Sequence, residues 1–372
     1  MSNNQWLHTP HYSSSCPLLQ TVGANLLNVY PSQVSLLRKF VTVYVLRSGI
    51  SMEKRTLGKS GIAITPIIMG TWQAGKGGWV GIEDDDIISA LKAAFDAGIT
   101  TFDTAEVYGN GYSEQIVAKA LSDVRDQVVL ATKVFANHLK YDQVLEACDR
   151  SLQHLNTEYI DLYQIHWPAG SFNNELVPIG ETMEALNKLQ DQGKIRAIGV
   201  SNFSGNQLAE ASQYGQIASL QPPYNLFWRG VETDAMPYCV ENNISILAYS
   251  PLAQGLLTGK FKPDHQFQEG DVRAKNKLFK GQNYERAQAA LSRLRPIAER
   301  HQCTLAQLAL AWLIAQPQTC AIAGARNAEQ ALQNVKAADI NLSSDDLAEI
   351  SAIGRTVTDH LDSNPVMWEF AA

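Results

Sequence analysis

The sequence, 372 residues long, lacks the marks of several protein classes. Its five cysteines are scattered and form no Cys-x-x-Cys pair, so it predicts neither a disulfide framework nor a zinc site, and we expect no bound metal. No long apolar run is free of polar residues, which argues against a membrane segment. A net charge of -7 argues against a nucleic-acid partner, because phosphate contacts need clustered Lys and Arg.

Acidic residues are missing from the first 50 positions, where only Arg38, Lys39 and Arg47 are charged. This composition loosely matches an organellar transit segment, and it also fits a poorly ordered leader or sequence upstream of a true start at Met52. We predict that residues 1–51 are an N-terminal extension with little structure and that residues 52–372 form the folded domain. The cysteine pattern fits a reducing compartment, so we expect a cytoplasmic protein, or an imported one if the extension is a transit segment.

The sequence does contain a regular alternation of short and long patterns. Short strand-like runs are each followed by a longer amphipathic stretch, and alternating strands and helices form parallel sheets. The runs are residues 67–71, 100–103, 128–133, 160–166, 195–200, 217–221, 245–250 and 320–325. Neither "GKGGWVG" nor "YGNGYSE" has the Gly-x-Gly-x-x-Gly spacing of an open dinucleotide-binding sheet. We therefore predict an α/β fold, a single closed (β/α)8 TIM barrel.

Several predicted helix ends carry suitable chemistry. Gly98 and Gly193 are placed to end helices, because glycine readily adopts the left-handed conformation found there. Ser204 and Gln207 form a Ser-x-x-Gln capping box that is typical of a helix start.

Polar side chains stand at the ends of three neighbouring predicted strands. Asp103 ends the second strand, Lys133 the third and His166 the fourth, and Tyr108 follows Asp103 by five residues. In such barrels the active site lies at the carboxyl ends of the strands, and neighbouring strands are only ~5 Å apart. We therefore expect these four side chains to meet at one rim.

These four residue types suit the protonation of an oxygen anion as it forms. Lys133 is expected to favour the phenolate and so to lower the pKa of Tyr108, while Asp103 keeps Lys133 charged. His166 can hydrogen-bond the substrate oxygen. No pattern for an activated nucleophile is present, which argues against a hydrolase. Each residue also fits a structural role, with Asp103 and Lys133 as an ion pair, Tyr108 as a loop aromatic and His166 as a core histidine.

Six segments occur in an order that is known from one family: "FDTAEVYG", "LATKV", "DLYQIHWP", "GKIRAIGVSNF", "LAYSPL" and "AIAGARNAEQ". Over roughly residues 53 to 355 the chain resembles the aldo-keto reductases. The resemblance implies a (β/α)8 barrel and reversible hydride transfer between a nicotinamide cofactor, usually NADPH, and an aldehyde or ketone. It places the catalytic tetrad of the family on Asp103, Tyr108, Lys133 and His166, with Tyr108 as the general acid.

The resemblance also implies a cofactor site. Ser201 and Asn202, aided by Gln221, match residues that hold the nicotinamide amide, and Tyr249 matches the aromatic platform under the ring. The same residues also fit helix capping and an ordinary rim tyrosine. The other implied contacts lie at the end of the first strand, in the loop around the pyrophosphate and at the adenosine end, and comprise Gly70, Thr71, Trp72, Asp103, Ser250, Leu252, Gln254, Gly255, Gly324, Arg326, Gln330 and Asn334.

Two positions depart from a familiar branch of the family. Positions 324 and 330 carry Lys and Arg in many members but are Gly and Gln here. Arg326 is therefore the cation expected to meet a 2′-phosphate, which Arg can bind in a bidentate fashion. NADPH is the expected cofactor, with NADH as the alternative. The extension at residues 1–51 has no counterpart in the usual pattern of the family.

The substrate side is expected to combine a polar centre with an aromatic wall. Tyr108 and His166 would contact the carbonyl oxygen, and Trp72 and Trp167 would line the wall, although tryptophans at these positions also fit plain packing. Two segments are candidates for covering the pocket. Residues 253–282 are too long for a simple connection and are expected to form a lid over the pyrophosphate. In the C-terminal tail, Met367 and Trp368 are weaker candidates.

The leading hypothesis is an NADPH-dependent oxidoreductase that reduces aldehydes or ketones to alcohols. The alternative is a regulatory module that binds a nicotinamide nucleotide but turns over little substrate, like relatives that serve as potassium-channel β-subunits. The expected partner is a small carbonyl compound. The oligomeric state is not fixed by the sequence, and a monomer is compatible with it.

Overall fold

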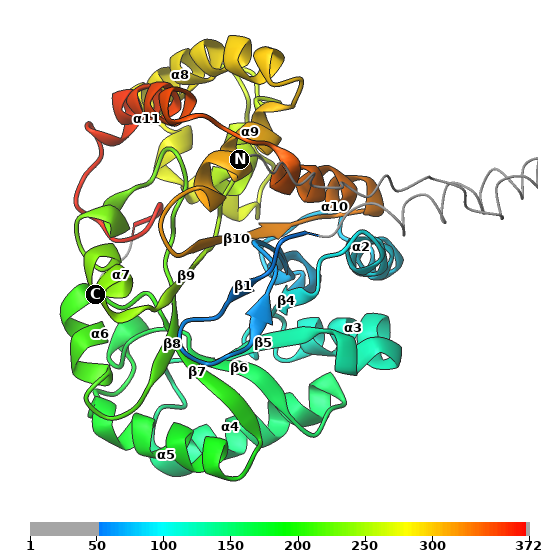
Figure 1. Ribbon diagram of the computed structural model, residues 1–372, viewed down its shortest axis with the longest axis vertical. Helices are drawn as coiled ribbons and strands as arrows, with labels where there is room; N and C mark the ends of the chain where they lie inside the picture. The colour runs from blue at the N-terminus through cyan, green and yellow to red at the C-terminus, as the bar shows by residue number, and fades with distance from the viewer. Residues whose placement is uncertain (1–51, 370–372) are drawn as a thin grey trace, which may run out of the picture. The chain divides into compact units, whose positions relative to one another are not determined.

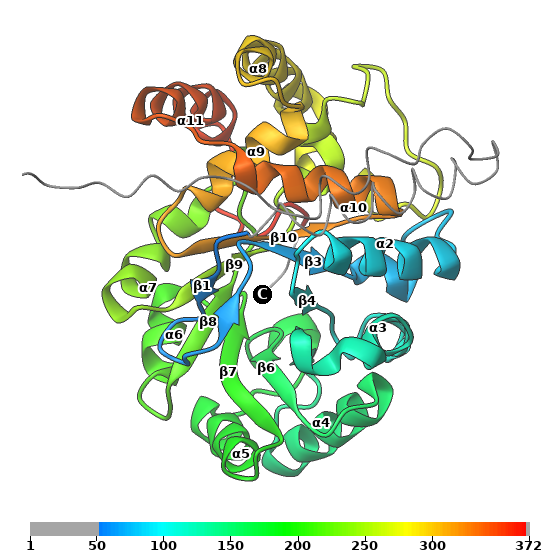
Figure 2. The ribbon, with the colours of Figure 1, turned by 45° about the vertical axis from the view of Figure 1, so that its right-hand side comes forward.

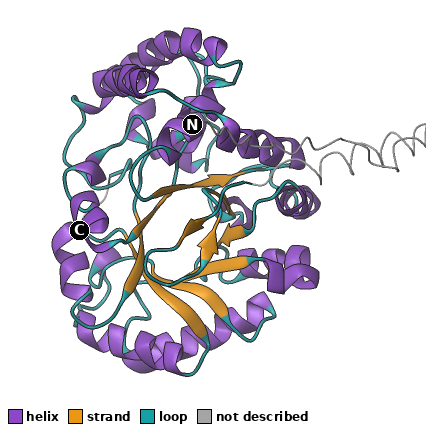
Figure 3. Ribbon diagram, viewed as in Figure 1, coloured by secondary structure: helices purple, strands orange, loops and turns teal. Residues whose placement is uncertain are grey.

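A computed structural model of the protein describes residues 52–369. Eight parallel strands form a closed barrel inside a ring of helices (Figures 1 and 3). The (β/α)8 fold predicted from the sequence is therefore confirmed. The predicted N-terminal extension, residues 1–51, lies outside the described residues.

The barrel strands follow chain order around the ring, and the last strand closes it. They are β3 (Ile67–Gly70), β4 (Thr101–Asp103), β5 (Val129–Val134), β6 (Ile160–Ile165), β7 (Ile195–Ser201), β8 (Ile217–Gln221), β9 (Ser245–Ala248) and β10 (Thr319–Gly324). β10 pairs in parallel with both β9 and β3, so no edge is left unpaired. Each strand lies where the sequence predicted it, with small shifts at the ends.

Helices cover the outer face of the barrel, and Figure 2 shows them around the strands in a second view. They are α2 (Asp84–Asp96), α3 (Tyr112–Leu121), α4 (Tyr141–Leu155), α5 (Ile179–Asp191), α6 (Gly205–Ala211), α7 (Met236–Asn242), α8 (Gly281–Arg300), α9 (Leu305–Ile314), α10 (Ala328–Val335) and α11 (Ser344–Thr358). Because the helices cover one face of the strands and side chains fill the other, the strand residues are almost all buried.

The predicted helix ends are confirmed. The backbone N–H of Gln207 donates to Ser204 Oγ, and the N–H of Ser204 donates to Gln207 Oε1 at 3.0 Å, which completes the capping box of α6. Gly98 and Gly193 follow the ends of α2 and α5 with φ of 99° and 72°. In the part of the chain that the structure describes, no helix combines the length and the apolar character needed to cross a membrane.

Two elements were not predicted from the sequence. A hairpin of β1 (Arg55–Thr56) and β2 (Ala63–Ile64) closes the amino end of the barrel, where Leu57 and Ile64 join the apolar core inside the strands. Its strands are two residues long, which is too short for an alternating pattern to be recognised. The second element is α11, which packs against α8 near the C-terminal end of the described chain.

Candidate active site

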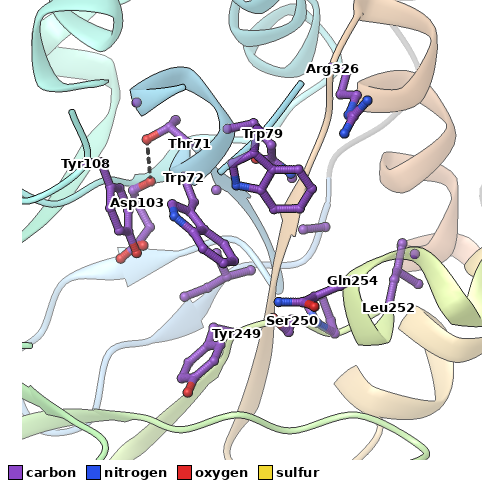
Figure 4. A pocket seen from close by; sticks show the side chains of 18 of the residues that line it. Thr71, Trp72, Trp79, Asp103, Tyr108, Tyr249, Ser250, Leu252, Gln254 and Arg326 are labelled. Atoms are coloured by element: carbon purple, nitrogen blue, oxygen red, sulfur yellow. Dashed lines mark hydrogen bonds between the residues drawn. The ribbon is translucent and has the colours of Figure 1, made fainter. Parts of the chain in front are cut away.

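A single cavity of about 800 Å³ opens at the carboxyl ends of the strands. Every residue that the sequence analysis assigned to catalysis, cofactor or substrate lines this cavity, except Lys133. Of the two tail candidates, Trp368 lines it and Met367 does not. Figure 4 shows part of the lining, with Tyr108 and Asp103 at one end, Arg326 at the other, and Trp72 and Trp79 between them. The cavity therefore joins the two groups of residues that the sequence had assigned to catalysis and to the adenosine end of a cofactor.

Lys133 lies beneath the cavity floor and is fully buried. Its Nζ donates to Asp103 Oδ1 at 2.6 Å and to the backbone carbonyl of Thr104 at 2.7 Å. Asp103 Oδ2 accepts from Gln221 Nε2 at 2.9 Å and from Gln164 Nε2 at 3.3 Å. Burial lowers the pKa of Lys133, and the carboxylate of Asp103 opposes that shift. Asp103 thus accepts from three donors, one of which is the buried cation Lys133.

Gln164 was not predicted as a site residue. It stands in β6, next to Tyr163 and Ile165, and its amide oxygen also accepts from Gln221 Nε2 at 3.2 Å. The sequence did carry a signal, because a polar residue within the apolar run of a barrel strand needs a partner inside the barrel. That signal does not say which residue the partner is.

Tyr108 reaches the same rim from the loop between β4 and α3. Its ring lies 5.2 Å from Lys133 Nζ and 5.7 Å from the His166 ring, measured at the ring centroid, and the two rings meet edge to face. The loop packs tightly against Gly75. A Cβ atom added to Gly75 would lie only 2.6 Å from the backbone of Tyr108. The four side chains that the sequence placed at one rim are therefore neighbours in the structure.

The expected direction of the Tyr108 pKa shift was wrong. Burial of the phenol, reinforced by the nearby negative charge of Asp103, raises the pKa of Tyr108 far above its usual value. Lys133 does not reverse this shift, because Asp103 pairs directly with its ammonium group and offsets its field. Tyr108 is a protonated phenol, and the sequence had pointed to an unusually acidic one.

His166 is a neutral imidazole. Burial, together with the charge of Lys133, lowers the pKa of His166 well below its usual value. Its Nδ1 is buried and has no hydrogen-bond partner among the described residues. Since buried ring nitrogens normally find partners, this neutral imidazole has unused hydrogen-bonding capacity beside the cavity.

Three polar residues form a chain across the middle of the cavity. Asn202 Nδ2 donates to the backbone carbonyl of His166 at 3.0 Å and to Ser201 Oγ at 3.1 Å. Tyr249 donates from its hydroxyl to Asn202 Oδ1 at 2.9 Å. Asn202 has a positive φ of 62°, which asparagine tolerates better than most residues. This backbone turn directs the Asn202 amide back toward β6 and β9.

Three cations gather at the far end of the cavity. Arg326 lies 5.4 Å from the ring of Trp79, and Arg273 lies 5.6 Å from the same ring. Burial and the neighbouring positive charge of Arg273 lower the pKa of Arg326, and desolvation together with both arginines lowers the pKa of Lys260. Arg326 Nη2 and Trp79 Nε1 are buried without partners in the described part of the chain. These features are those of an anion site.

Of Trp79, Lys260, Arg273 and Arg326, only Arg326 was predicted as a site residue. Lys260 and Arg273 belong to the long connection between β9 and α8, which contains the short 3₁₀ helices η5 (Ala253–Thr258), η6 (Val272–Lys275) and η7 (Lys277–Phe279). The N–H of Val272 donates to the carbonyl of Gly78 at 3.2 Å, so the connection reaches the loop that carries Trp79. A charged residue in a long loop has no periodicity that would assign it to a site from sequence alone.

The backbone after β9 has an unusual conformation. Ser250, Ala253, Gln254 and Gly255 all have positive φ, and three of them are not glycine. Left-handed residues next to right-handed ones turn successive N–H groups toward one side, an arrangement that binds anions.

Gly324, at the end of β10, approaches the Gln73 side chain so closely that a Cβ added to it would lie 2.4 Å from that side chain. Asn334 Nδ2 donates to the carbonyl of Gly324 at 3.3 Å.

Aromatic side chains line the other end of the cavity. Trp72 lies 6.4 Å from Tyr108, and Phe135 lies 5.6 Å from His166, between ring centroids. Phe172 stacks on Phe135 at 5.5 Å and meets Trp167 edge to face at 5.0 Å. Trp368 borders the same end, as the sequence suggested for the tail.

Phe135 and Phe172 were not predicted. Phe172 has a positive φ of 58°, which is rare for a bulky residue and is a form of backbone strain that often marks functional sites. No sequence pattern announces such a conformation. Among the described residues, no group of three or more His, Cys, Asp or Glu is arranged to hold a metal ion.

Comparisons with known proteins agree with this geometry. The model of the "Aldo/keto reductase family" matches residues 66–355. Aldo-keto reductase YhdN of Bacillus subtilis is 38% identical over 333 residues, which cover 86% of this chain and 98% of that protein. The NADH-specific methylglyoxal reductase of Escherichia coli is 37% identical over 317 residues, which cover 79% of this chain and 96% of that protein.

Solved structures are similar over the same region. The glycerol dehydrogenase of Gluconobacter oxydans has a TM-score of 0.74 and 34% identity, with 87% of this chain and 100% of that chain covered. An aldo-keto reductase of Klebsiella pneumoniae in complex with NADPH has a TM-score of 0.66 and 30% identity, with 86% of this chain and 100% of that chain covered.

Proposed function

Because the chain belongs to the aldo/keto reductase family, we propose that it is an NADPH-dependent oxidoreductase that reduces aldehydes or ketones to alcohols. One observation carries the proposal. A single cavity has a protonated phenol beside a neutral imidazole at one end and three cations at the other. A nicotinamide dinucleotide has the same polarity, with its reactive ring at one end and its charged phosphates toward the other.

The residues of the cavity fit this cofactor. Arg326 Nη2 and Trp79 Nε1 are buried donors that need acceptors, and phosphate oxygens are strong acceptors. Ser250, Gln254 and Gly255 would meet the pyrophosphate through the turned backbone, with the long connection of Lys260 and Arg273 as its lid. Asn202, Ser201 and Gln221 would hold the nicotinamide amide. Tyr249 would exchange its bond to Asn202 for a place under the ring.

When bound, the cofactor supplies a hydride to the carbonyl carbon of the substrate. The protein's part is to hold the carbonyl oxygen and to give it a proton. We assign the proton to the Tyr108 hydroxyl and the orientation of the oxygen to His166. General acid catalysis of this kind contributes about 10²- to 10⁴-fold to a rate.

A phenol with a raised pKa suits this role. It stays protonated at neutral pH, and it releases its proton only to a strong base. The oxygen of a carbonyl that has accepted hydride is an alkoxide, which is still a stronger base than the phenolate that Tyr108 would become. Lys133 lies 5.2 Å from the Tyr108 ring and is held in place by Asp103. Its ammonium group would limit the cost of the negative charge that develops on the phenol, with part of its field offset by Asp103.

We infer a preference for NADPH over NADH. Arg326 has a donor without a partner, and Arg273 and Lys260 add positive charge around it. Asp271 pairs with Arg273 and offsets part of this charge. A 2′-phosphate would neutralise the remaining positive charge, whereas an unmodified ribose would leave it without an anion. Among the relatives, one protein is NADH-specific by name and another was solved with NADPH, so both cofactors are used within the family.

The substrate is an uncharged carbonyl compound. Tyr108 and His166 supply the polar contacts, and Trp72, Phe135 and Phe172 supply an apolar surface around them. This wall contains no charged side chain that would bind a carboxylate or phosphate on the substrate, judged by the residues that line it in the described chain.

A cofactor and substrate screen tests the proposal. The purified protein is mixed with NADPH or NADH and with benzaldehyde, methylglyoxal or a simple ketone, and oxidation is followed by absorbance. We expect turnover with NADPH and at least one aldehyde. Arg326→Ala should raise KM for NADPH about 10-fold and leave KM for NADH nearly unchanged, since one ion contact is lost only for the phosphorylated cofactor. No turnover with either cofactor would overturn the proposal, and equal effects on both cofactors would overturn the assignment of Arg326.

A further inference from the structure

Glu106 is a buried acid without an assigned role. It lies two residues before Tyr108, in the loop between β4 and α3, and is 9% exposed. It is not among the residues that line the cavity. A carboxylate buried to this extent needs hydrogen-bond partners, because its desolvation is otherwise costly.

The partners of Glu106 belong to the next loop, between β5 and α4. Its Oε1 accepts from the backbone N–H of Phe135 at 2.8 Å and from His138 Nδ1 at 3.0 Å. Its Oε2 accepts from Arg150 Nη2 at 3.4 Å. The N–H of His138 donates to the carbonyl of Phe135 at 3.0 Å, so residues 135–138 form a closed turn. One carboxylate oxygen therefore binds both ends of this turn.

The aromatic wall of the substrate end rests on the same turn. The Phe135 ring lies 5.6 Å from the His166 ring and stacks on Phe172. The next residue, Ala136, is buried in a cluster with Trp167 and Val366, against which Trp368 also packs. A shift of the turn would thus move both Phe135, which stacks on Phe172, and Ala136, which packs against Trp167.

The other side of Glu106 is fixed to the loop that carries the phenol. Its carbonyl accepts from the N–H of Gly111 at 2.7 Å, and its own N–H donates to the carbonyl of Lys133 at 3.4 Å. Tyr108 lies between these two anchored points in sequence. The Glu106 side chain therefore ties the loop of Tyr108 directly to the turn that carries Phe135.

We propose that Glu106 is a positioning residue that sets the width of the substrate gap, by holding the turn of residues 135–138 against the loop of Tyr108. The inference rests on the proposed function, since it concerns the gap in which the carbonyl substrate would bind. Its consequence is selectivity. A large aromatic aldehyde touches the wall and depends on the width of the gap, whereas a small aldehyde needs only Tyr108 and His166.

Glu114 provides a matched control. It is a fully buried carboxylate on α3 that accepts from Thr132 Oγ1 at 2.7 Å and pairs with His154 Nδ1 at 3.1 Å. Like Glu106, it is therefore a buried glutamate that pairs with a histidine. Its contacts, however, are to the body of β5 and to α4, away from the turn of residues 135–138.

The test compares Glu106→Ala, Glu106→Gln and Glu114→Gln with the wild-type protein. Steady-state kinetics are measured with benzaldehyde and with methylglyoxal, and NADPH affinity is measured by quenching of tryptophan fluorescence. Near-ultraviolet circular dichroism reports on the aromatic wall without any need for turnover. Glu106→Gln keeps an oxygen that can accept from Phe135, so it is also the variant that is expected to fold most readily.

We expect Glu106→Ala to lower kcat/KM at least ~10-fold for benzaldehyde, since misplacement by about 1 Å can cost ~100-fold, with a much smaller loss for methylglyoxal. NADPH affinity should stay within about twofold, because Glu106 is remote from the cations of the cavity. Glu106→Gln should recover most of the loss, and Glu114→Gln should alter neither the substrate ratio nor the near-ultraviolet spectrum.

Three results would overturn the inference: an unchanged ratio of kcat/KM between the two aldehydes in both Glu106 variants, the same change of ratio in Glu114→Gln, or an aromatic spectrum that does not respond to Glu106 substitution. If the wild-type protein turns over neither aldehyde, the proposed function fails on its own. The near-ultraviolet spectra then still decide whether Glu106 holds the wall.

Discussion

Lys133 and Asp103 form a buried ion pair at the floor of the candidate site. Lys133 is fully buried and Asp103 is 3% exposed, with 2.6 Å between Nζ and Oδ1. Burying each ion alone costs several kcal/mol, and the pair is tolerated because each charge has an opposite charge and further hydrogen bonds. Gln164 and Gln221 complete the shell of Asp103. The proposed catalytic tetrad is therefore built on a pair whose members cannot be changed singly without a loss of stability.

Lys133→Met should be strongly destabilising as well as inactivating. The substitution leaves the Asp103 carboxylate buried without a cation, which costs about 3–5 kcal/mol in the free energy of unfolding. Turnover should fall at least ~100-fold, because the developing charge on Tyr108 loses its nearest cation. Urea denaturation and NADPH oxidation with an aldehyde measure the two effects.

The double variant Asp103→Asn with Lys133→Met separates stability from catalysis. Removing both charges should restore most of the lost stability, because replacing a whole buried ion pair is often nearly neutral. Activity should stay low. A double variant that regains wild-type turnover would show that the pair serves only the fold.

The pH dependence of the reaction follows from the two shifted pKa values. The pKa of Tyr108 is raised above its ordinary value of about 10, so its proton is lost only at higher pH. The pKa of His166 is lowered, so the imidazole gains a proton only as the pH falls well below its usual range. We expect kcat/KM for an aldehyde, at saturating NADPH, to be flat between about pH 6 and pH 9. A decline within that interval that disappears in Tyr108→Phe would contradict the assigned direction.

At the scale of elements, the long connection between β9 and α8, which is the proposed lid, is hydrogen-bonded to the C-terminal tail. The N–H of Lys277 donates to the carbonyl of Met367 at 2.7 Å, and the buried sulfur of Met367 lies 3.5 Å from Asn225 Nδ2. Asn225 also donates to the carbonyl of Ser250 at 3.0 Å, and Asn276 donates to Gln254 Oε1 at 3.0 Å. Met367 of the tail thus lies between Asn225 and Asn276. These two asparagines hydrogen-bond Ser250 and Gln254 of the proposed pyrophosphate loop.

Asn276→Ala should loosen the cofactor without affecting the chemistry. It removes the bond that Asn276 Nδ2 donates to Gln254 and the bond that Asn276 Oδ1 accepts from the N–H of Leu278, at about 1 kcal/mol each. The loss of one or both bonds corresponds to roughly 5- to 30-fold faster dissociation of NADPH. The ratio of the reduction rates for different aldehydes should stay unchanged. Stopped-flow fluorescence measures the dissociation rate.

Asn243→Ala is the control for this prediction. Asn243 donates to the carbonyl of Gly58 at the opposite end of the barrel, so its loss removes an asparagine hydrogen bond that is remote from the lid. Equal dissociation rates in the Asn276 variant and this control would show that the lid contact does not retain the cofactor.

At the scale of the whole molecule, the fold was predictable because its pattern repeats. Each barrel strand is an apolar run bounded by turn residues, and each helix shows one apolar face, so eight repeats support one another where a single one would be ambiguous. The hairpin of β1 and β2 breaks the repeat. It is held by long-range contacts, such as the bond from the N–H of Gly58 to Ser245 Oγ at 2.8 Å, that no local pattern contains.

The candidate site was predictable to a different extent for its strand residues and for its loop residues. Asp103, Lys133 and His166 stand at strand ends, where topology alone brings them together. Arg273, Phe135 and Phe172 lie in loops whose course depends on tertiary contacts. The direction of the Tyr108 pKa shift also required the structure, because it depends on burial and on how closely Asp103 offsets Lys133.

The central claim is that the Tyr108 hydroxyl gives its proton to the carbonyl oxygen during reduction. The most direct measurement compares Tyr108→Phe with the wild-type protein, in NADPH binding by fluorescence and in aldehyde reduction at saturating NADPH. We predict that affinity for NADPH changes little, while kcat falls by about 10²- to 10⁴-fold, the usual contribution of a general acid. Reduction of the aldehyde by Tyr108→Phe at a rate close to that of the wild-type protein would contradict the claim.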